Sequence, residues 1–352
     1  MRLMFVYWHV ENAGSAQTIY NYSQVAKALG HEVVLYAPET PNSRFNCSLD
    51  VEAADAVIFL LEWNIYLHDN KPLDLEGPVR RTPRGRRIVI DDDGMYNDVL
   101  RVGEDYNHSD ADGSRQRIEL YDWISDRIFQ PTLHPLRPNV QTFFFHAYDP
   151  AWEVPLDFSA KEYGMVYVGS NWFRWRAMQM VLQAVAPIRD RIGRIKIVGH
   201  NWEEPPLGAE SPFREAAYAT DPAYLDMLNV ERMPAVPIEQ VIPTMSKGIF
   251  NPVLLRPVFN HLRLVNPRLF ETPAANTIPL FGLDPEYVQE IYGDRALELV
   301  LAGPGDGASE QILDLLHRPG YYTEIVKDMR RHLAEKHSYT TRLKELIEIV
   351  KD

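Results

Sequence analysis

Short apolar runs alternate with helical spacings of apolar residues along the first half of the chain. The spacing over 16–29 predicts a helix that ends at Gly30, and a second helix is expected at 115–125. Mostly apolar runs predict buried strands at 3–8, 32–36, 56–61, 87–90, 127–130 and 140–145. This order indicates an α/β fold in which helices cover a parallel sheet.

A proline-containing stretch at 147–157 precedes a second alternation of the same kind. Strands are expected at 165–168, 194–198, 248–251 and 278–281. Helices are expected at 175–188, 241–245, 267–275 and 322–350. A chain of 352 residues is also longer than one hydrophobic core usually serves. We therefore expect two α/β domains joined by the stretch at 147–157.

Glycines and polar residues gather directly after the predicted strands. They are Gly14-Ser15, Asp91-Asp92-Asp93-Gly94, His146, Gly169-Ser170-Asn171 and Gly199-His200-Asn201. Parallel α/β folds bind ligands in the crevice outside the carboxyl ends of their strands. With two such domains the crevice lies between them, so these residues are predicted to line an interdomain site.

Two of these turns are suited to an anion. Gly14-Ser15 opens the first helix, whose N-terminal N–H groups carry a partial positive charge, although the sequence does not fit the dinucleotide pattern G-x-G-x-x-G. Gly169-Ser170-Asn171 has Arg174 and Arg176 just beyond it, which favours a diphosphate. Both also fit plain turns that pack a strand against a helix.

The stretch Asn266-Pro267-Arg268-Leu269-Phe270-Glu271-Thr272 is the most informative. Arg268 can hold phosphate oxygens by forked hydrogen bonds, and Glu271 can accept both hydroxyls of a ribose. The two residues are three apart and share a helix face. The same spacing also fits a simple surface ion pair.

Consecutive carboxylates at Asp91-Asp92-Asp93 are a candidate for Mg²⁺ or Mn²⁺. Side chains alternate along a strand, so at most two of the three face the crevice together. We favour acceptor binding or turn formation by Asp92, Asp93, Gly94 and Tyr96 over a metal site.

Two histidines lie beside the predicted crevice. His146 is placed to touch a sugar hydroxyl or a departing phosphate, and a structural role is the equal alternative. His9 and Glu11, next to the first turn, carry the same ambiguity.

The net charge and the cysteine content limit which binding partners and which cellular location are expected. A formal charge of −13 disfavours a broad surface for nucleic acid or anionic lipid. Cys47 is the only cysteine, so an internal disulfide or a cysteine-based zinc site is excluded and a cytoplasmic location is expected. No apolar run approaches the ~20 residues of a membrane-spanning helix.

The segment at 266–279 resembles the R-L-F-E-A-x-A-C-G-T-P-x-I pattern of the spore-maturation CgeB-like branch of group 1 glycosyltransferases, a GT-B family. Residues 167–175 resemble the strand and loop that open the donor domain of that group. Residues 337–342, His-Ser-Tyr-Thr-Thr-Arg, resemble its closing H-T-Y-x-x-R helix, and residues 14–33 its first loop, helix and G-H-E-V turn. The chain departs from the pattern at Thr272-Pro273 and at Asn276.

The resemblance implies a GT-B fold, that is, two Rossmann-like domains with a cleft between them. It implies an acceptor domain at 1–150, a nucleotide-sugar donor domain at 151–335 and a helix at 336–352 that packs back on the first domain. Glu271 would bind the donor ribose, Arg268 would face the diphosphate and the backbone at 169–171 would line the phosphates. The departures place the identity of the donor sugar in question.

The implied reaction moves a sugar from a nucleoside diphosphate to a hydroxyl or amine of a small molecule or glycan, with retention. A metal and other cofactors are not expected, and nucleic acid is a disfavoured partner. Donor-binding residues would be Gly169, Ser170, Asn171, Arg174, His200, Asn266, Arg268, Leu269, Phe270, Glu271 and Thr272. Catalytic residues would be His146, Asp92 and Asp93, and acceptor-binding residues Glu11, Gly14, Ser15, Gly94 and Tyr96.

Three further hypotheses accompany this prediction. The polar segment 101–114, expected to be mobile, is a candidate lid over the acceptor. A nucleotide-sugar epimerase or hydrolase of the same fold would consume the donor without an acceptor. A non-catalytic nucleotide-sugar-binding protein would bind the donor and leave it intact.

Overall fold

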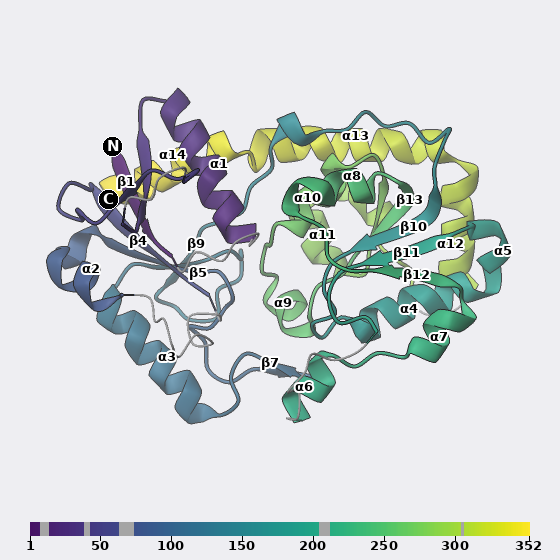
Figure 1. Ribbon diagram of the computed structural model, residues 1–352, viewed down its shortest axis with the longest axis horizontal. Coiled ribbons are helices and arrows are strands. Elements are labelled where there is room, and N and C mark those ends of the chain that lie inside the picture. Colours follow the sequence, from purple (N-terminus) through teal and green to yellow (C-terminus); the bar gives the residue numbers. More distant parts are fainter. Residues whose placement is uncertain (8–13, 39–42, 63–73, 204–211, 304–305) are drawn as a thin grey trace.

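A computed structural model describes residues 1–7, 14–38, 43–62, 74–203, 212–303 and 306–352. Two parallel sheets, one from each half of the chain, stand side by side with helices packed around them (Figure 1). The two alternations of strand and helix in the sequence therefore correspond to two separate α/β layers.

The first sheet is parallel throughout. Its strands, in spatial order, are β3 (Cys47–Ser48), β2 (Glu32–Tyr36), β1 (Arg2–Val6), β4 (Ala56–Leu61), β5 (Arg87–Asp91), β8 (Ile128–Gln130) and β9 (Val140–Thr142). Leu3 and Phe5 pack into one hydrophobic cluster and Met4 and Val6 into another. Strand β1 is thus covered on both faces, which explains its apolar run from Leu3 to Val6.

The helices of this half are α1 (Gly14–Ala28), α2 (Glu76–Arg81) and α3 (Ala111–Ile124). Ile19, Tyr22 and Ala26 of α1 are buried on one face, as their spacing predicts. Gly30 follows the helix with φ of +76°, a left-handed conformation that glycine adopts without strain.

The second sheet is also parallel. Its strands, in spatial order, are β12 (Val230–Met233), β11 (Ile195–Val198), β10 (Tyr163–Val168), β13 (Gly248–Val253) and β14 (Ile278–Phe281). The surrounding helices are α4 (Trp175–Val185), α5 (Arg189–Ile192), α6 (Pro212–Ala217), α7 (Pro222–Met227), α8 (Val241–Met245), α9 (Pro257–Leu262), α10 (Arg268–Ala274), α11 (Pro285–Tyr292) and α12 (Asp306–His317).

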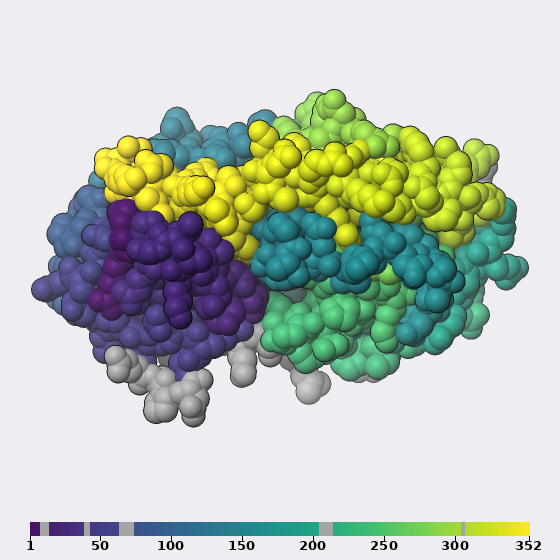
Figure 2. Space-filling model, turned by 90° about the horizontal axis from the view of Figure 1, so that it is seen from above, coloured from purple at the N-terminus to yellow at the C-terminus, as the bar shows by residue number. Residues whose placement is uncertain are grey.

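The C-terminal tail, predicted as one helix, consists of two. Helix α13 (Pro319–Lys336) packs on the second sheet's domain and α14 (Tyr339–Lys351) on α1 of the first. Figure 2 shows this tail, in yellow, running over both halves. The helix breaks where Ser338 caps α14 by accepting a bond from Thr341 N at 3.3 Å. At the same point Tyr148 N donates to His337 O at 2.8 Å.

The polar segment at 101–114 contains regular structure, whereas the sequence predicted a loop. Strands β6 (Arg101–Val102) and β7 (Asp105–Tyr106) form an antiparallel hairpin, and α3 already begins at Ala111. Asp110 caps that helix by accepting a bond from Gly113 N at 2.8 Å. Asp105 of the hairpin is fully buried and accepts hydrogen bonds from the second domain, from Arg256 Nε at 3.0 Å and from Val258 N at 2.9 Å.

Two smaller boundaries also differ from the expected ones. The helix expected at 175–188 ends at Val185 and gives way to a 3₁₀ turn over Ala186–Ile188, where Pro187 removes a helical hydrogen bond. The strand expected at 140–145 ends at Thr142. In the described ranges, none of the helices has the length and apolar character needed to cross a bilayer.

Candidate functional site

A cavity of about 760 Å³ opens between the two domains. Most of the residues that line it lie at or after the carboxyl ends of β1, β4, β5 and β9 in the first sheet and of β10, β11, β12 and β13 in the second, and the start of α10 completes the lining. The crevice predicted from the strand ends is therefore present, and both halves of the chain contribute to it.

The first domain contributes small and acidic residues to the cavity. They are Gly14, Ser15, Glu62, Asp92, Asp93 and His146. A Cβ atom on Gly14 would lie 2.8 Å from Cγ of Pro267 in the second domain. Glycine is therefore required where α1 approaches the entry of α10.

His146 is held on both sides. Its Nδ1 lies 2.8 Å from Thr18 Oγ1, and its Nε2 lies 2.8 Å from Asp92 Oδ2. The imidazole is almost fully buried, with 2% of its surface exposed. Because both ring nitrogens have partners, the geometry suits a residue that orients Asp92 better than one that exchanges protons with a substrate.

Asp91 has a structural role. Its carboxylate accepts bonds from Met95 N at 2.9 Å, from Tyr96 N at 2.8 Å and from Gln130 Nε2 at 2.7 Å. Burial raises the pKa of Asp91 to about 6, and these hydrogen bonds act against that rise. Asp91 forms the turn after β5, which leaves Asp92 and Asp93 to line the cavity.

Glu62 lines the cavity and was not predicted. It follows β4 and accepts hydrogen bonds from Ser15 Oγ and, at 3.3 Å, from Tyr7 OH. Burial, together with the negative charges of Asp93 and Asp92, raises the pKa of Glu62 to about 8. Its position directly after the strand predicted at 56–61 was the available signal, but a single acid there carries no motif.

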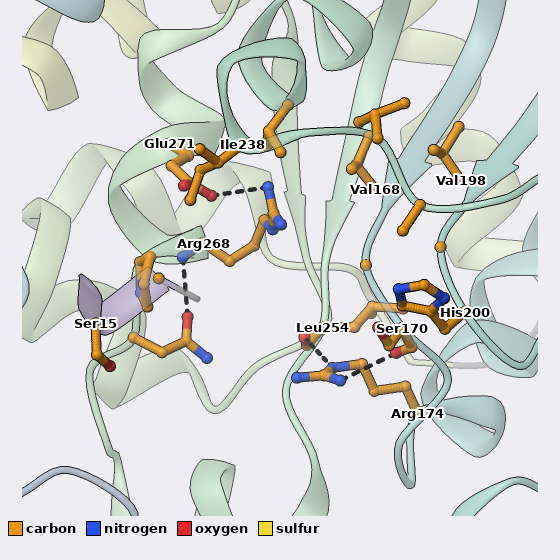
Figure 3. Close-up of a pocket in the computed structure, with 18 of the residues that line it drawn as sticks. Ser15, Val168, Ser170, Arg174, Val198, His200, Ile238, Leu254, Arg268 and Glu271 are labelled. Atoms are coloured by element: carbon orange, nitrogen blue, oxygen red, sulfur yellow. Dashed lines mark hydrogen bonds and ion pairs between the residues drawn. The ribbon is translucent and has the colours of Figure 1, made fainter. Parts of the chain in front are cut away.

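The second domain presents Arg268 and Glu271 to the cavity. Arg268 Nη1 lies 2.8 Å from Glu271 Oε2, so the predicted shared helix face and the alternative ion pair are both present (Figure 3). Helix α10 begins at Arg268, and Arg268 N donates to Asn266 Oδ1 at 3.1 Å. Asn266 and Pro267 also line the cavity.

The loop after β10 faces these residues across the cavity. Gly169, Ser170 and Arg174 of this loop line the cavity, together with His200 from the loop after β11. Arg174 donates from Nη1 to Ser170 O at 3.0 Å and from Nε to Leu254 O at 3.4 Å (Figure 3). Burial lowers the pKa of Arg174 from its usual range, yet a guanidinium remains charged at neutral pH.

A close approach of two backbones shapes this loop. A Cβ atom on Gly199 would lie 2.1 Å from Gly169 O. Only glycine allows the turns after β10 and β11 to meet in this way.

Four predicted donor residues do not line the cavity. Asn171 is fully buried and donates to Asn201 O at 3.1 Å and to Ala219 O at 2.7 Å, so it holds the loop together. Leu269 and Phe270 lie in the hydrophobic core, and Thr272 is fully buried beside Met245. The helix turns Leu269, Phe270 and Thr272 away from the cavity. Arg268 and Glu271, three residues apart, share the face that lines it.

Two predicted acceptor residues are also placed elsewhere. Gly94, with φ of +68°, lies beneath Leu262 and Leu264. Tyr96 is buried, stacks on Tyr121 and donates to Asp122. The turn fixed by Asp91 directs both away from the cavity, and Glu11 lies outside the described residues.

An apolar part of the cavity was missed as well. It is lined by Ala235, Val236, Pro237, Ile238 and Val241, which follow β12. Their position after a strand was the available signal, but β12 itself was not predicted. In the described part of the chain, no group of three or more His, Cys, Asp or Glu residues is arranged to hold a metal ion.

Comparison with known proteins supports the architecture. Residues 176–348, nearly half of the chain, match the model of a glycosyl transferase-like family. No curated protein matches the sequence significantly.

Solved structures match along the whole chain. T4 phage BGT in complex with UDP and Mn²⁺ is 13% identical with a TM-score of 0.58, and the match covers 100% of this chain and 99% of that chain. An α-glucosyltransferase in complex with UDP and a 13-mer DNA is 14% identical with a TM-score of 0.60, again over 100% and 99%. The chain thus has the GT-B fold of two Rossmann-like domains, and the part that contains Arg268 and Glu271 matches a glycosyltransferase-like family.

Proposed function

We propose that the protein is a glycosyltransferase that moves a sugar from a nucleoside-diphosphate sugar to a hydroxyl or amine acceptor. The observation that carries this proposal is the Arg268–Glu271 pair on the wall of an interdomain cavity in a GT-B fold. A purely structural ion pair gives no reason for both groups to line the cavity between the two domains.

The donor lies against the second domain. Glu271 accepts hydrogen bonds from the ribose hydroxyls, while Arg268 and the loop at 169–170 bind the diphosphate. Arg174, from the same domain, also lines the cavity and supplies a second positive charge. Entry of the donor exchanges the contact between Arg268 and Glu271 for contacts with phosphate and ribose.

The departing diphosphate is stabilised by protein charge and not by a metal ion. Arg174 is fixed by its contacts to Ser170 O and Leu254 O before the donor arrives. Preorganised cations of this kind lower the energy of the charge that develops on a leaving group. Retention at the anomeric carbon belongs to the same proposal and is supported by the resemblance of residues 266–279 to the CgeB-like group.

The acceptor binds against the first domain. Asp92, held by His146, and Asp93 accept hydrogen bonds from its hydroxyl or amine. The carboxylates of Glu62, Asp92 and Asp93 lie together on this side. The negative charges of Asp92 and Asp93 repel phosphates, so a small molecule or a glycan fits better than the DNA present with the α-glucosyltransferase.

Uridine diphosphate is the first nucleotide to test, because the two solved structures compared above contain UDP. A cytoplasmic setting, where nucleotide sugars are made, agrees with the single cysteine at Cys47.

The test is a thermal-shift and calorimetric titration with UDP, GDP, dTDP and CDP and with their sugars. One nucleotide should raise the melting temperature, because a ligand that binds only the folded state stabilises it. Absence of a shift with every nucleotide would contradict the proposal. Release of nucleotide without an acceptor would instead favour the epimerase or hydrolase, and binding without any cleavage the non-catalytic protein.

A further inference from the structure

A buried ion pair joins the two domains beside the cavity. Asp105 comes from β7 in the first domain, and Arg256 directly precedes α9 in the second. Arg256 Nε donates to Asp105 Oδ2 at 3.0 Å, and Nη2 donates to Asp105 Oδ1. Val258 N also donates to Asp105 Oδ2, at 2.9 Å, and Arg256 Nη2 reaches Tyr106 O at 3.0 Å.

Both side chains of the pair are buried away from solvent. Asp105 is 0% exposed and Arg256 9% exposed. The forked contact satisfies both carboxylate oxygens, and desolvation costs a buried pair much of its Coulombic attraction. A pair of this kind is therefore weak as a stabilising device but strict in its geometry, because either charge left alone would be buried without compensation.

The pair is continuous with the donor side of the cavity. The guanidinium carbon of Arg256 lies 5.2 Å from the ring centroid of Phe259, which lines the cavity, and 5.4 Å from that of Phe173. Phe173 has φ of +55° and directly precedes Arg174. Arg174 in turn donates to Leu254 O, two residues before Arg256. Segment 254–259 thus connects the ion pair with the arginine that faces the cavity.

We propose that Asp105 and Arg256 are a positioning pair, through which the 101–106 hairpin of the first domain sets the conformation of segments 169–174 and 254–259. These two segments hold Arg174 and Phe259 in the shape that accepts the donor diphosphate. The consequence for the donor rests on the proposed function, whereas the consequence for the two segments does not. The hairpin predicted as a lid over the acceptor is, in this account, a fixed part of the donor site.

The experiment uses the double variant D105N/R256Q in the full chain. It removes both charges together, so no uncompensated charge remains buried and the protein is expected to fold. The matched control is E104Q, which removes the exposed ion pair that the same hairpin forms between Glu104 and Arg176 at 3.4 Å. Hydrogen exchange of the backbone amides and the dissociation constant of UDP are measured for each protein.

Faster exchange in segments 169–174 and 254–259 of the double variant, with wild-type exchange in E104Q, is the expected result. UDP binding should weaken at least about tenfold in the double variant and remain unchanged in the control. Wild-type exchange in both segments of a folded double variant would overturn the proposal. If the wild-type protein binds no nucleotide, the proposed function fails, and the exchange measurement still decides the role of the pair.

Discussion

At the scale of single residues, the acidic side of the cavity combines carboxylates in different surroundings. Asp91 is surrounded by hydrogen-bond donors and builds a turn, while Asp92 is oriented by His146. Glu62 instead lies near the charges of Asp92 and Asp93, and only Ser15 and Tyr7 donate to it among the bonds described. Its neighbours therefore favour the protonated form.

This difference predicts how Glu62 affects stability with pH. Its pKa is about 8 in the folded protein and near 4.5 in the unfolded chain. The folded state holds the proton more tightly, so the contribution is fully present below pH 4.5 and is lost as the pH rises through 8. E62Q stays neutral, and its melting temperature should therefore exceed that of the wild type increasingly between pH 5 and 9.

Thermal unfolding of both proteins across this range measures the effect. The control is Glu52→Gln, on the surface of the same domain. A constant difference between wild type and E62Q at all pH values would show that Glu62 ionises normally.

Residue types and positions after strands were sufficient to predict much of the cavity lining. Gly14, Asp92, His146 and Gly169 lie on it because parallel strands end at a common edge. Side-chain direction was not predictable in the same way. Whether a loop residue points inward or outward depends on the backbone turn, and contacts distant in sequence set that turn.

At the scale of elements, α10 depends on a residue far along the chain. Arg330 of α13 donates from Nε to Pro273 O at 2.7 Å and from Nη2 to Ala274 O at 3.0 Å and Ala275 O at 2.9 Å. Carbonyls at the end of a helix lack partners within it, and a cation there also interacts favourably with the helix dipole. Arg330 thus fixes the end of the helix that begins with Arg268.

R330M should lower the free energy of unfolding by about 3 kcal/mol, because Pro273 O and Val154 O lose the buried donor that Arg330 supplies, while Ala274 O and Ala275 O keep only Val154 N and Thr277 N. Urea denaturation measures the change. The matched control is R331M, since Arg331 is exposed and pairs only with Asp328 among the bonds described. Equal stability of R330M and R331M would contradict this role.

Elements with a local pattern were predictable and those fixed by distant partners were not. The strands β1, β2, β4 and β5 follow from apolar runs in the sequence. The β6–β7 hairpin looked like a polar loop, because its anchor Arg256 is 151 residues from Asp105. The break between α13 and α14 was likewise hidden, since its cause is the contact with Tyr148.

At the scale of the whole molecule, the chain crosses between domains twice. The stretch at 147–157 leads out of the first domain, and α14 returns to it at the end. Tyr339, Leu343, Leu346 and Ile347 of α14 are part of the hydrophobic core of the first domain. Helix α14 therefore completes the hydrophobic core of the first domain. The exact domain limits at 150 and 335 stay predictions.

L343A tests this dependence. Leu343 is 0% exposed, and truncation of a buried leucine costs about 3 kcal/mol through lost burial and the cavity left behind. The first domain should become easier to unfold by that amount, as monitored by hydrogen exchange in β1 and β4. K344A, at the exposed neighbouring position, is the control. Normal protection of β1 and β4 in L343A would show that α14 is dispensable for the first domain.

We propose above that Glu271 and Arg268 bind the nucleotide of the donor sugar. Isothermal titration of UDP into E271A tests it most directly, with E324A on the exposed face of α13 as the control. We expect the affinity for UDP to be at least about tenfold weaker in E271A and unchanged in E324A. Wild-type affinity in a correctly folded E271A protein would contradict the account.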